Sequence, residues 1–371
     1  MEQIYLDYNA STPIASEVKD AMRPFLEEYY GNPSALHFAG THNKQAIENA
    51  RMQVSRLINA TPNEITFTSG GSEANNHVLK GIFESYANKG THIITTRIEH
   101  PAILNPCHYL EKHGAKVTYL EVDQYGRVDL HAVEEAITNE TILISIMHAN
   151  NEVGTIQPIH EIGQIARKHG VLFHTDASQS VGKVPLDVNS LQVDFLTIAG
   201  HKMYAPKGVG ALYIREGIKI EPLIHGAGHE SGRRAGTENV LLIVGLGKAC
   251  ELAEYYQAEV VQVRNLRDYF WNQLQSLPNV KVSLNGHPDS RLPNTLNVNF
   301  EGRVGQEILD RLPQIAASTG SACHAGSVNL SPVLKAMGVE ELIGMGAVRF
   351  SLGKYTTKEE IDQVIELLNT I

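Results

Sequence analysis

The sequence is poor in cysteine and in long apolar runs, and each shortage excludes a class of protein. Among its 371 residues are three cysteines, Cys107, Cys250 and Cys323, which are widely spaced and include no CxxC pair. Neither a disulfide framework nor a structural zinc site is therefore expected. No apolar run approaches the ~18–20 residues that a membrane-spanning helix needs. The first residues lack the basic and apolar segments of a secretory signal, so we expect a cytoplasmic protein without membrane contacts.

Positive charge is scarce relative to negative charge. Lysine and arginine total 31 and aspartate and glutamate total 41, which leaves a formal net charge of −10. An acidic surface repels the phosphates of nucleic acids, so we expect no direct nucleic-acid partner. The hydrophobic fraction of 42% is ordinary for a globular protein, and the length favours two structural parts.

Short apolar runs alternate with segments of helical periodicity through much of the chain. The predicted strands cover 65–67, 92–95, 117–120, 141–147, 171–175, 195–199 and 209–214. The predicted helices cover 41–60, 131–137 and 159–169, the last ended by Gly170. This alternation indicates an α/β fold with a largely parallel sheet. A long helix over 240–277 then leads to runs at 280–284, 294–300 and 347–351, which indicate a smaller α+β part.

Three polar motifs follow predicted strands, at the end of the sheet where α/β folds bind ligands. Thr68–Asn76 places glycines before a helix whose N-terminus attracts anions, although Ser72 could instead simply cap that helix. Asp176 could pair with a protonated heteroaromatic nitrogen or cap the next helix. Lys202 could be desolvated, which lowers its pKa and favours Schiff-base formation, or could be an ordinary loop lysine. Their joint occurrence favours the functional interpretations.

Three further segments carry groups suited to binding or reaction. The loop over Arg233–Thr237 could bind an anion or simply face solvent. Arg349 lies in an apolar run and could bind a substrate carboxylate or an internal one. Cys323 lies among small residues beside a histidine, and a thiolate near a cation is reactive. Cys107 and Cys250 lie in helical surroundings and are expected to be inert apolar residues.

Taken in order, these motifs resemble those of the cysteine desulfurases in the class V aminotransferase family, which are pyridoxal-phosphate enzymes of fold type I. The matching segments are YLDYNASTP at 5–13, GNPS at 31–34, TSGGSEANN at 68–76, EH at 99–100, NNEVG at 150–154, HTDASQ at 174–179, GHK at 200–202, AGTEN at 235–239, SAC at 321–323 and RFS at 349–351. The resemblance implies a fold-type I α/β architecture with a large cofactor-binding domain over 13–255. A small α+β domain would combine 1–12 with 256–371 and carry Cys323.

The resemblance also implies a role for each matching side chain. Lys202 would bind pyridoxal phosphate covalently, Asp176 would keep its pyridine nitrogen protonated, and Gln179 would contact its phenolic oxygen. His100 would stack on the ring and move protons. The other implied cofactor contacts are Gly71, Ser72, Asn150, Gly200, His201 and, from a second subunit, Thr237. The implied substrate contacts are Asn9, Asn32 and Arg349, and Cys323 would accept the sulfur.

The segment that follows Cys323 is long, as in the housekeeping and nitrogen-fixation desulfurases. The resemblance therefore implies a homodimer that converts L-cysteine to L-alanine and passes sulfur, as a Cys323 persulfide, to an acceptor protein of iron–sulfur assembly or thiolation. No resident metal is expected, only a transient contact of Cys323 with an iron–sulfur cluster.

Two departures from the usual desulfurase pattern favour an alternative. Position 199 is Ala where many desulfurases carry a phosphate-binding serine, and Cys323 is followed by His324. Both features are similar to selenocysteine lyases, which release selenium and alanine from L-selenocysteine. A non-catalytic relative or a nucleotide-binding module is the alternative from a different class, and it would lack a coloured, lysine-bound cofactor.

Overall fold

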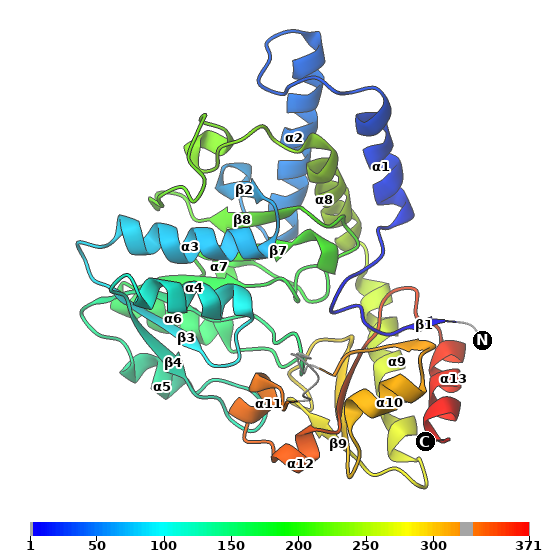
Figure 1. Ribbon diagram of the computed structural model, residues 1–371. Coiled ribbons are helices and arrows are strands. Elements are labelled where there is room, and N and C mark those ends of the chain that lie inside the picture. The colour runs from blue at the N-terminus through cyan, green and yellow to red at the C-terminus, as the bar shows by residue number, and fades with distance from the viewer. Residues whose placement is uncertain (1–2, 320–328, 371) are drawn as a thin grey trace.

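The computed structural model describes residues 3–319 and 329–370, so Cys323 lies outside the described residues. Its centre is a seven-stranded sheet with the order β2-β8-β7-β6-β5-β3-β4 (Figure 1). The strands are β2 Ile65–Thr68, β3 His92–Thr96, β4 Lys116–Leu120, β5 Thr141–Ser145, β6 Leu172–Asp176, β7 Phe195–Ala199 and β8 Gly210–Ile214. Strand β8 is antiparallel to both of its neighbours, and the other pairs are parallel.

Helices cover both faces of this sheet because successive strand side chains point to opposite sides. On one face, Ile93, Leu143, Phe195 and Leu212 share a core with α3 (Gly71–Ser85) and α4 (Pro101–Glu111). On the other face, Ile94, Ile144, Leu196 and Tyr213 share a core with α2 (Phe38–Leu57), α6 (Ile159–His169) and α8 (Val240–Ala253). Where two adjacent residues of these strands are both named, one thus lies in the first core and the other in the second core.

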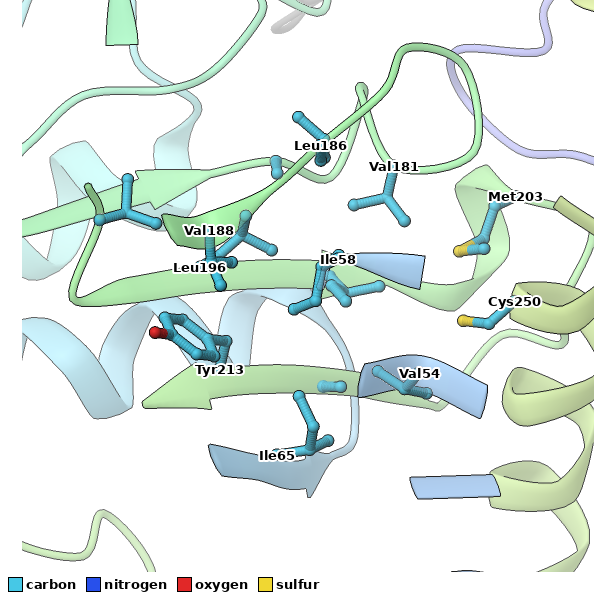
Figure 2. Packing of buried hydrophobic residues seen from close by; sticks show 14 of the residues in the cluster. Val54, Ile58, Ile65, Val181, Leu186, Val188, Leu196, Met203, Tyr213 and Cys250 are labelled. Carbon is cyan, nitrogen blue, oxygen red and sulfur yellow. The ribbon is translucent and has the colours of Figure 1, made fainter. Parts of the chain in front are cut away.

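Figure 2 shows the second of these cores from close by. Val54 of α2 and Ile58, the residue that follows α2, lie over the strands that carry Leu196 and Tyr213. Cys250 of α8 lies in the same core and is fully buried, as Cys107 is in the core on the opposite face. Burial also raises the pKa of both thiols, that of Cys107 to about 12. The structure therefore confirms that these two cysteines are inert core residues.

The remaining helices of this part are short or lie at its edge. They are α1 Ser16–Glu27, α5 Leu130–Glu135 and α7 Val188–Leu191, with 3-10 turns η1 Pro62–Glu64, η2 Gly200–Lys202 and η3 Glu230–Gly232. Helices α1 and α2 both pack against α8.

A second, separate core joins the beginning of the chain to its C-terminal third. Its antiparallel sheet has the order β12-β10-β9, and a parallel pair joins β1 to β11. The strands are β1 Ile4–Tyr5, β9 Val282–Asn285, β10 Thr295–Phe300, β11 Ile315–Ala316 and β12 Ala347–Ser351. The helices are α9 Gln257–Gln275, α10 Gly305–Arg311, α11 Pro332–Ala336, α12 Glu341–Gly344 and α13 Lys358–Leu368. The predicted α/β class with a smaller α+β part is confirmed, and the domain division at residues 12 and 256 stays a prediction.

One predicted element is wrong. The helix expected over 240–277 is two helices, because α8 ends at Ala253 and α9 begins at Gln257. The break brings the Tyr256 ring against Lys354, whose Nζ lies 4.5 Å from the ring centroid and donates to the Tyr256 hydroxyl at 2.7 Å. Because Tyr256 and Lys354 are far apart in the sequence, their contact produces no local pattern from which the helix break could be predicted.

Helices that cross a membrane are long and apolar. Within residues 3–319 and 329–370, no helix combines the length and the hydropathy that a membrane crossing requires.

Candidate active site

A cavity of about 630 Å³ lies at the carboxyl ends of β6 and β7. Such a volume suits a small aromatic cofactor together with its substrate. Nine of the predicted site residues line it: Asn9, Gly71, Ser72, His100, Asp176, Gln179, His201, Lys202 and Arg349. They come from both parts of the chain, so the folded protein assembles the site from segments far apart in sequence.

Lys202 ends the turn η2, which directly follows β7. Its Nζ donates to the carbonyl oxygen of Asn9 at 2.7 Å and to that of Ala10 at 2.9 Å. Burial lowers the pKa of Lys202 to about 8, and the nearby guanidinium of Arg349 acts in the same direction. An amine with such a pKa is neutral often enough near neutral pH to act as a nucleophile or a base.

Asp176 is the last residue of β6 and is buried, with 8% exposure. Its Oδ2 accepts from Asn75 Nδ2 at 2.7 Å, and its Oδ1 accepts from the Ser178 backbone N–H at 2.9 Å. No cation pairs with this carboxylate among the described residues. A buried carboxylate held by neutral donors suits a positively charged group in the cavity.

Gln179 lies one turn beyond Asp176 and bridges two partners. Its Nε2 donates to the carbonyl oxygen of Asn9 at 3.0 Å, and its Oε1 accepts from Lys183 Nζ at 3.1 Å. The Asn9 carbonyl oxygen therefore accepts from both Gln179 and Lys202. This shared acceptor fixes the two side chains relative to one another at the cavity wall.

His100 lies at the N-cap of α4, where its Nδ1 accepts from the Ala102 backbone N–H at 3.1 Å. Burial lowers the pKa of His100, which favours the neutral ring with its proton on Nε2. The preceding Glu99 anchors this segment, because its Oε1 accepts from the Met147 backbone N–H at 2.9 Å. The Glu99–His100 pair thus combines an anchor with a ring that lines the cavity.

The N-terminus of α3 forms the anion-binding end of the cavity. Gly70 precedes the helix without a side-chain cap, so the first N–H groups are available to a ligand. Gly210 of β8 makes this position possible, because a Cβ there would lie 2.8 Å from Cα of Gly70. Ser72 and His201 line the same end, and burial lowers the pKa of His201 to about 4, so its ring is neutral.

Arg349 of β12 lies opposite, at the small core's side of the cavity. Its Nη2 donates to Asp7 Oδ1 at 2.7 Å and its Nη1 to the Asn151 carbonyl oxygen at 2.9 Å. Its Nε is buried and has no hydrogen-bond partner among the residues that the structure describes. A guanidinium with donors to spare at a cavity wall suits a planar carboxylate.

Four predicted residues do not line this cavity. Asn150 is fully buried, and its Nδ2 donates to the Ile98 carbonyl oxygen at 3.0 Å, so its amide anchors the His100 segment. Gly200 packs against Val209, the residue before β8, because a Cβ on Gly200 would lie 2.9 Å from the Val209 carbonyl oxygen. Asn32 and Thr237 are exposed and are not among the residues that line the cavity. Cys323 lies outside the described residues.

Sequence reasoning gave no role to several residues that complete the site. Asn75, Ser178 and Asn151 line the cavity, and each lies inside a motif quoted for its neighbours. Asp7 holds Arg349 and also lies in a quoted motif. Their positions within those motifs were the available signal, but their partners are far apart in sequence.

These residues fit pyridoxal phosphate. The buried Asp176 carboxylate without a cation suits a protonated pyridine nitrogen, and the uncapped α3 N-terminus suits the phosphate. Lys202, which lines the same cavity, supplies an amine with a lowered pKa.

Comparisons with known proteins agree with this geometry. The aminotransferase class-V family model matches residues 4–364. The chain is 49% identical to a cysteine desulfurase IscS of Dictyoglomus turgidum and 50% identical to cysteine desulfurase 2 of Trichormus variabilis, covering all of this chain and 94% and 93% of those proteins. A solved NifS-like protein superposes with a TM-score of 0.93 at 39% identity, over 99% of this chain and 98% of the other. A solved structure of SspA in complex with cysteine gives a TM-score of 0.85 at 40% identity, over 95% of this chain and all of the other. The chain therefore belongs to the class-V aminotransferase family, within its pyridoxal-phosphate-dependent cysteine desulfurases.

Proposed function

We propose that this cysteine desulfurase converts L-cysteine to L-alanine in the cavity and transfers the sulfur to Cys323. The observation that carries the proposal is the arrangement of Lys202, Asp176 and Arg349 around one cavity. The cavity thus offers an amine, a buried carboxylate for a cationic ring and a guanidinium for a substrate carboxylate. The matched SspA structure holds cysteine, which supports the same substrate class here.

Arg349 binds the carboxylate of cysteine and so fixes the substrate's orientation. Asp7 and Asn151 hold the guanidinium from behind, which limits its rotation. Bound pyridoxal phosphate supplies an electron-withdrawing ring that stabilises negative charge on the substrate α-carbon. Asp176 keeps the ring nitrogen protonated, and Asn75 with the Ser178 N–H keeps Asp176 in place.

Lys202 removes the proton from the substrate α-carbon, because its Nζ lies at the cavity wall and its lowered pKa leaves part of the amine neutral. Its contact with the Asn9 and Ala10 carbonyls keeps the amine at the cavity wall. His100, neutral and with its proton on Nε2, lines the same cavity and would move protons to and from the bound substrate.

Sulfur transfer needs a nucleophile from the protein. The Cys323 thiolate attacks the substrate sulfur, so that a sulfur–sulfur bond forms as the bond between carbon and sulfur breaks. The electron pair of the broken bond returns to the substrate carbon, which takes up protons and leaves as alanine. Cys323 keeps the sulfur as a persulfide for an acceptor protein in the cytoplasm, in iron–sulfur assembly or thiolation.

The active form is a homodimer with Thr237 of one subunit reaching the phosphate of the other. Support comes from a set of exposed apolar side chains that runs from the last turn of α1 to the first residue of α2: Leu26, Tyr30, Leu36 and Phe38 are 70%, 93%, 100% and 91% exposed. Exposed apolar side chains of this size mark contact surfaces. Changing Leu36 and Phe38 to Glu should produce a monomer in sedimentation experiments. Leu342→Glu, at a residue 85% exposed in α12, is the control that should leave the dimer intact.

Product analysis tests the proposed activity directly. The purified protein is expected to be yellow and to release equal amounts of alanine and sulfide from L-cysteine in the presence of a thiol reductant. Consumption of L-selenocysteine without activity on L-cysteine would favour the lyase alternative instead. A colourless protein that makes no alanine from either amino acid would contradict both.

A further inference from the structure

Lys183 is a mostly buried lysine that the mechanism above does not use. It follows Gln179 in the turn after β6, and its Nζ donates to Gln179 Oε1 at 3.1 Å. No ion pair joins Lys183 to an acidic side chain in residues 3–319 or 329–370. Burial, with Lys202 and Arg349 nearby, lowers the pKa of Lys183 to about 7.

A buried cation without a carboxylate costs the fold stability. A neutral side chain of similar length, such as methionine, would fill the same space without that cost. Stability therefore does not explain why lysine occupies this position. Its hydrogen bond to Gln179 indicates a functional explanation instead.

The chemistry of the two partners of Gln179 determines which way its amide points. The ammonium form of Lys183 can only donate, so when it is protonated it holds the Gln179 oxygen toward itself. A backbone carbonyl can only accept, so the Gln179 nitrogen must face Asn9 and the cavity. If the amide were reversed while Lys183 is in place, Gln179 Oε1 would face the Asn9 carbonyl oxygen and Gln179 Nε2 would face the Lys183 ammonium. Both contacts would be repulsive.

We propose that Lys183 is a positioning residue, which holds the Gln179 amide so that its N–H group faces the phenolic oxygen of the cofactor. The inference rests on the role proposed for Gln179. Without Lys183, the Gln179 oxygen Oε1 loses the donor that fixes it, and the amide is free to rotate. The Gln179 N–H group would then become ordered only when the cofactor binds. The entropy lost in that ordering would weaken cofactor binding.

The test compares apoprotein variants with pyridoxamine phosphate, which carries the ring, phenolic oxygen and phosphate but cannot react covalently with Lys202. Dissociation constants and melting temperatures are measured for the unchanged protein, Lys183→Met, Lys183→Arg, Gln179→Ala and the Lys183→Met/Gln179→Ala double variant. Lys183→Met should weaken binding about 3- to 10-fold, the contribution of one ordinary hydrogen bond. Its melting temperature should stay equal or rise, and Lys183→Arg should bind like the unchanged protein, because arginine also only donates.

The double variant separates orientation from charge. If Lys183 acts through Gln179, Lys183→Met should have no further effect in the Gln179→Ala background. An undiminished effect there, or normal binding by Lys183→Met alone, would overturn the inference while leaving the role of Gln179 standing. Normal binding by Gln179→Ala would instead refute the proposed role of Gln179 and the inference with it. A lower melting temperature of Lys183→Met with normal binding would assign Lys183 a structural role only.

Discussion

The side-chain nitrogen of Lys202 lies 2.7 Å from the carbonyl oxygen of Asn9, a residue 193 positions earlier in the chain. Asn9 is itself held by the small core, since its Nδ2 donates to Thr295 Oγ1 at 2.8 Å and its backbone N–H to Ser351 Oγ at 2.9 Å. The amine donates to uncharged carbonyl oxygens, and within residues 3–319 and 329–370 no carboxylate forms an ion pair with it. That arrangement does not stabilise the ammonium strongly enough to offset its burial, so the pKa falls.

Replacing Lys202 should abolish turnover. Lys202→Ala removes the amine that holds the cofactor and takes the substrate proton, while the α3 N-terminus remains able to bind the phosphate. Alanine production from cysteine, measured by chromatography, should fall to background. Lys219→Ala changes an exposed lysine and should keep full activity. Near-normal alanine production by Lys202→Ala would refute the proposed role.

The rate at which apoprotein combines with pyridoxal phosphate should depend on pH through Lys202. The amine is charged below its pKa of about 8 and neutral above it, and only the neutral form attacks an aldehyde. The rate should rise about tenfold between pH 7 and pH 9 and then level off. Stopped-flow absorbance follows the reaction. A rate that keeps rising beyond pH 10 would mean that Lys202 has the ordinary lysine pKa of 10.5.

Asp176→Asn should lower turnover by about two orders of magnitude or more, because the pyridine nitrogen would lose the anion that keeps it protonated. Cofactor content should fall only modestly, since the amide has nearly the shape of the carboxylate. Steady-state rates and cofactor absorbance separate the two effects. Asn75→Ala should give a smaller loss of the same kind, because Asn75 only holds the carboxylate. Unchanged turnover in Asp176→Asn would reduce Asp176 to a structural residue.

Cys323→Ala should stop alanine formation from cysteine while the cofactor absorbance stays unchanged. In the unchanged protein, mass spectrometry after exposure to cysteine should find one added sulfur atom on Cys323. Cys107→Ala is the matched control, because burial raises the pKa of that thiol to about 12 and keeps it unreactive. Full-rate alanine production by Cys323→Ala would contradict the persulfide mechanism, and consumption of selenocysteine alone would favour the lyase.

Ala199→Ser should tighten cofactor binding. Ala199 lines the cavity, and its Cβ lies 3.4 Å from the point where a Cβ on Gly71 would be, beside the N-terminus of α3. A hydroxyl there would add a donor for the phosphate, worth about a 3- to 10-fold change in dissociation constant. Equilibrium binding of pyridoxamine phosphate measures it, and Ala199→Gly should bring no gain. Weaker binding by the serine variant would show that the position faces away from the phosphate.

Much of both sheets follows from the sequence, because their strands are short, apolar and bounded by turns. The predicted strands at 195–199 and 347–351 and the helix at 159–169 coincide with β7, β12 and α6. Gly170 ends that helix in a left-handed conformation with φ of 67°, as its position predicts. The antiparallel direction of β8 carried no such signal, because periodicity records which face a side chain takes and not the direction of the chain.

The candidate site divides in the same way. Lys202, Asp176 and Gln179 could be found from the sequence, because each lies at or just beyond the end of a strand, in a motif that resembles the family's. Lys183 could not, because a lysine four residues after Gln179 in a turn is indistinguishable in sequence from an exposed one. Asn150 matched a motif, yet its side chain turns away from the cavity to anchor Ile98.

The sequence by itself determined the class of fold, the family and the chemical identity of the groups at the strand ends, since these depend on local periodicity and on residue type. Only the tertiary structure decided what those groups contact: that Asn9 supports both Lys202 and Gln179, that Asp7 holds Arg349, and that Asn75 holds Asp176. The physical reason is that hydrogen bonds and desolvation depend on distances of a few ångströms between residues hundreds of positions apart. Those distances exist only once the two cores have packed and closed the cavity between them.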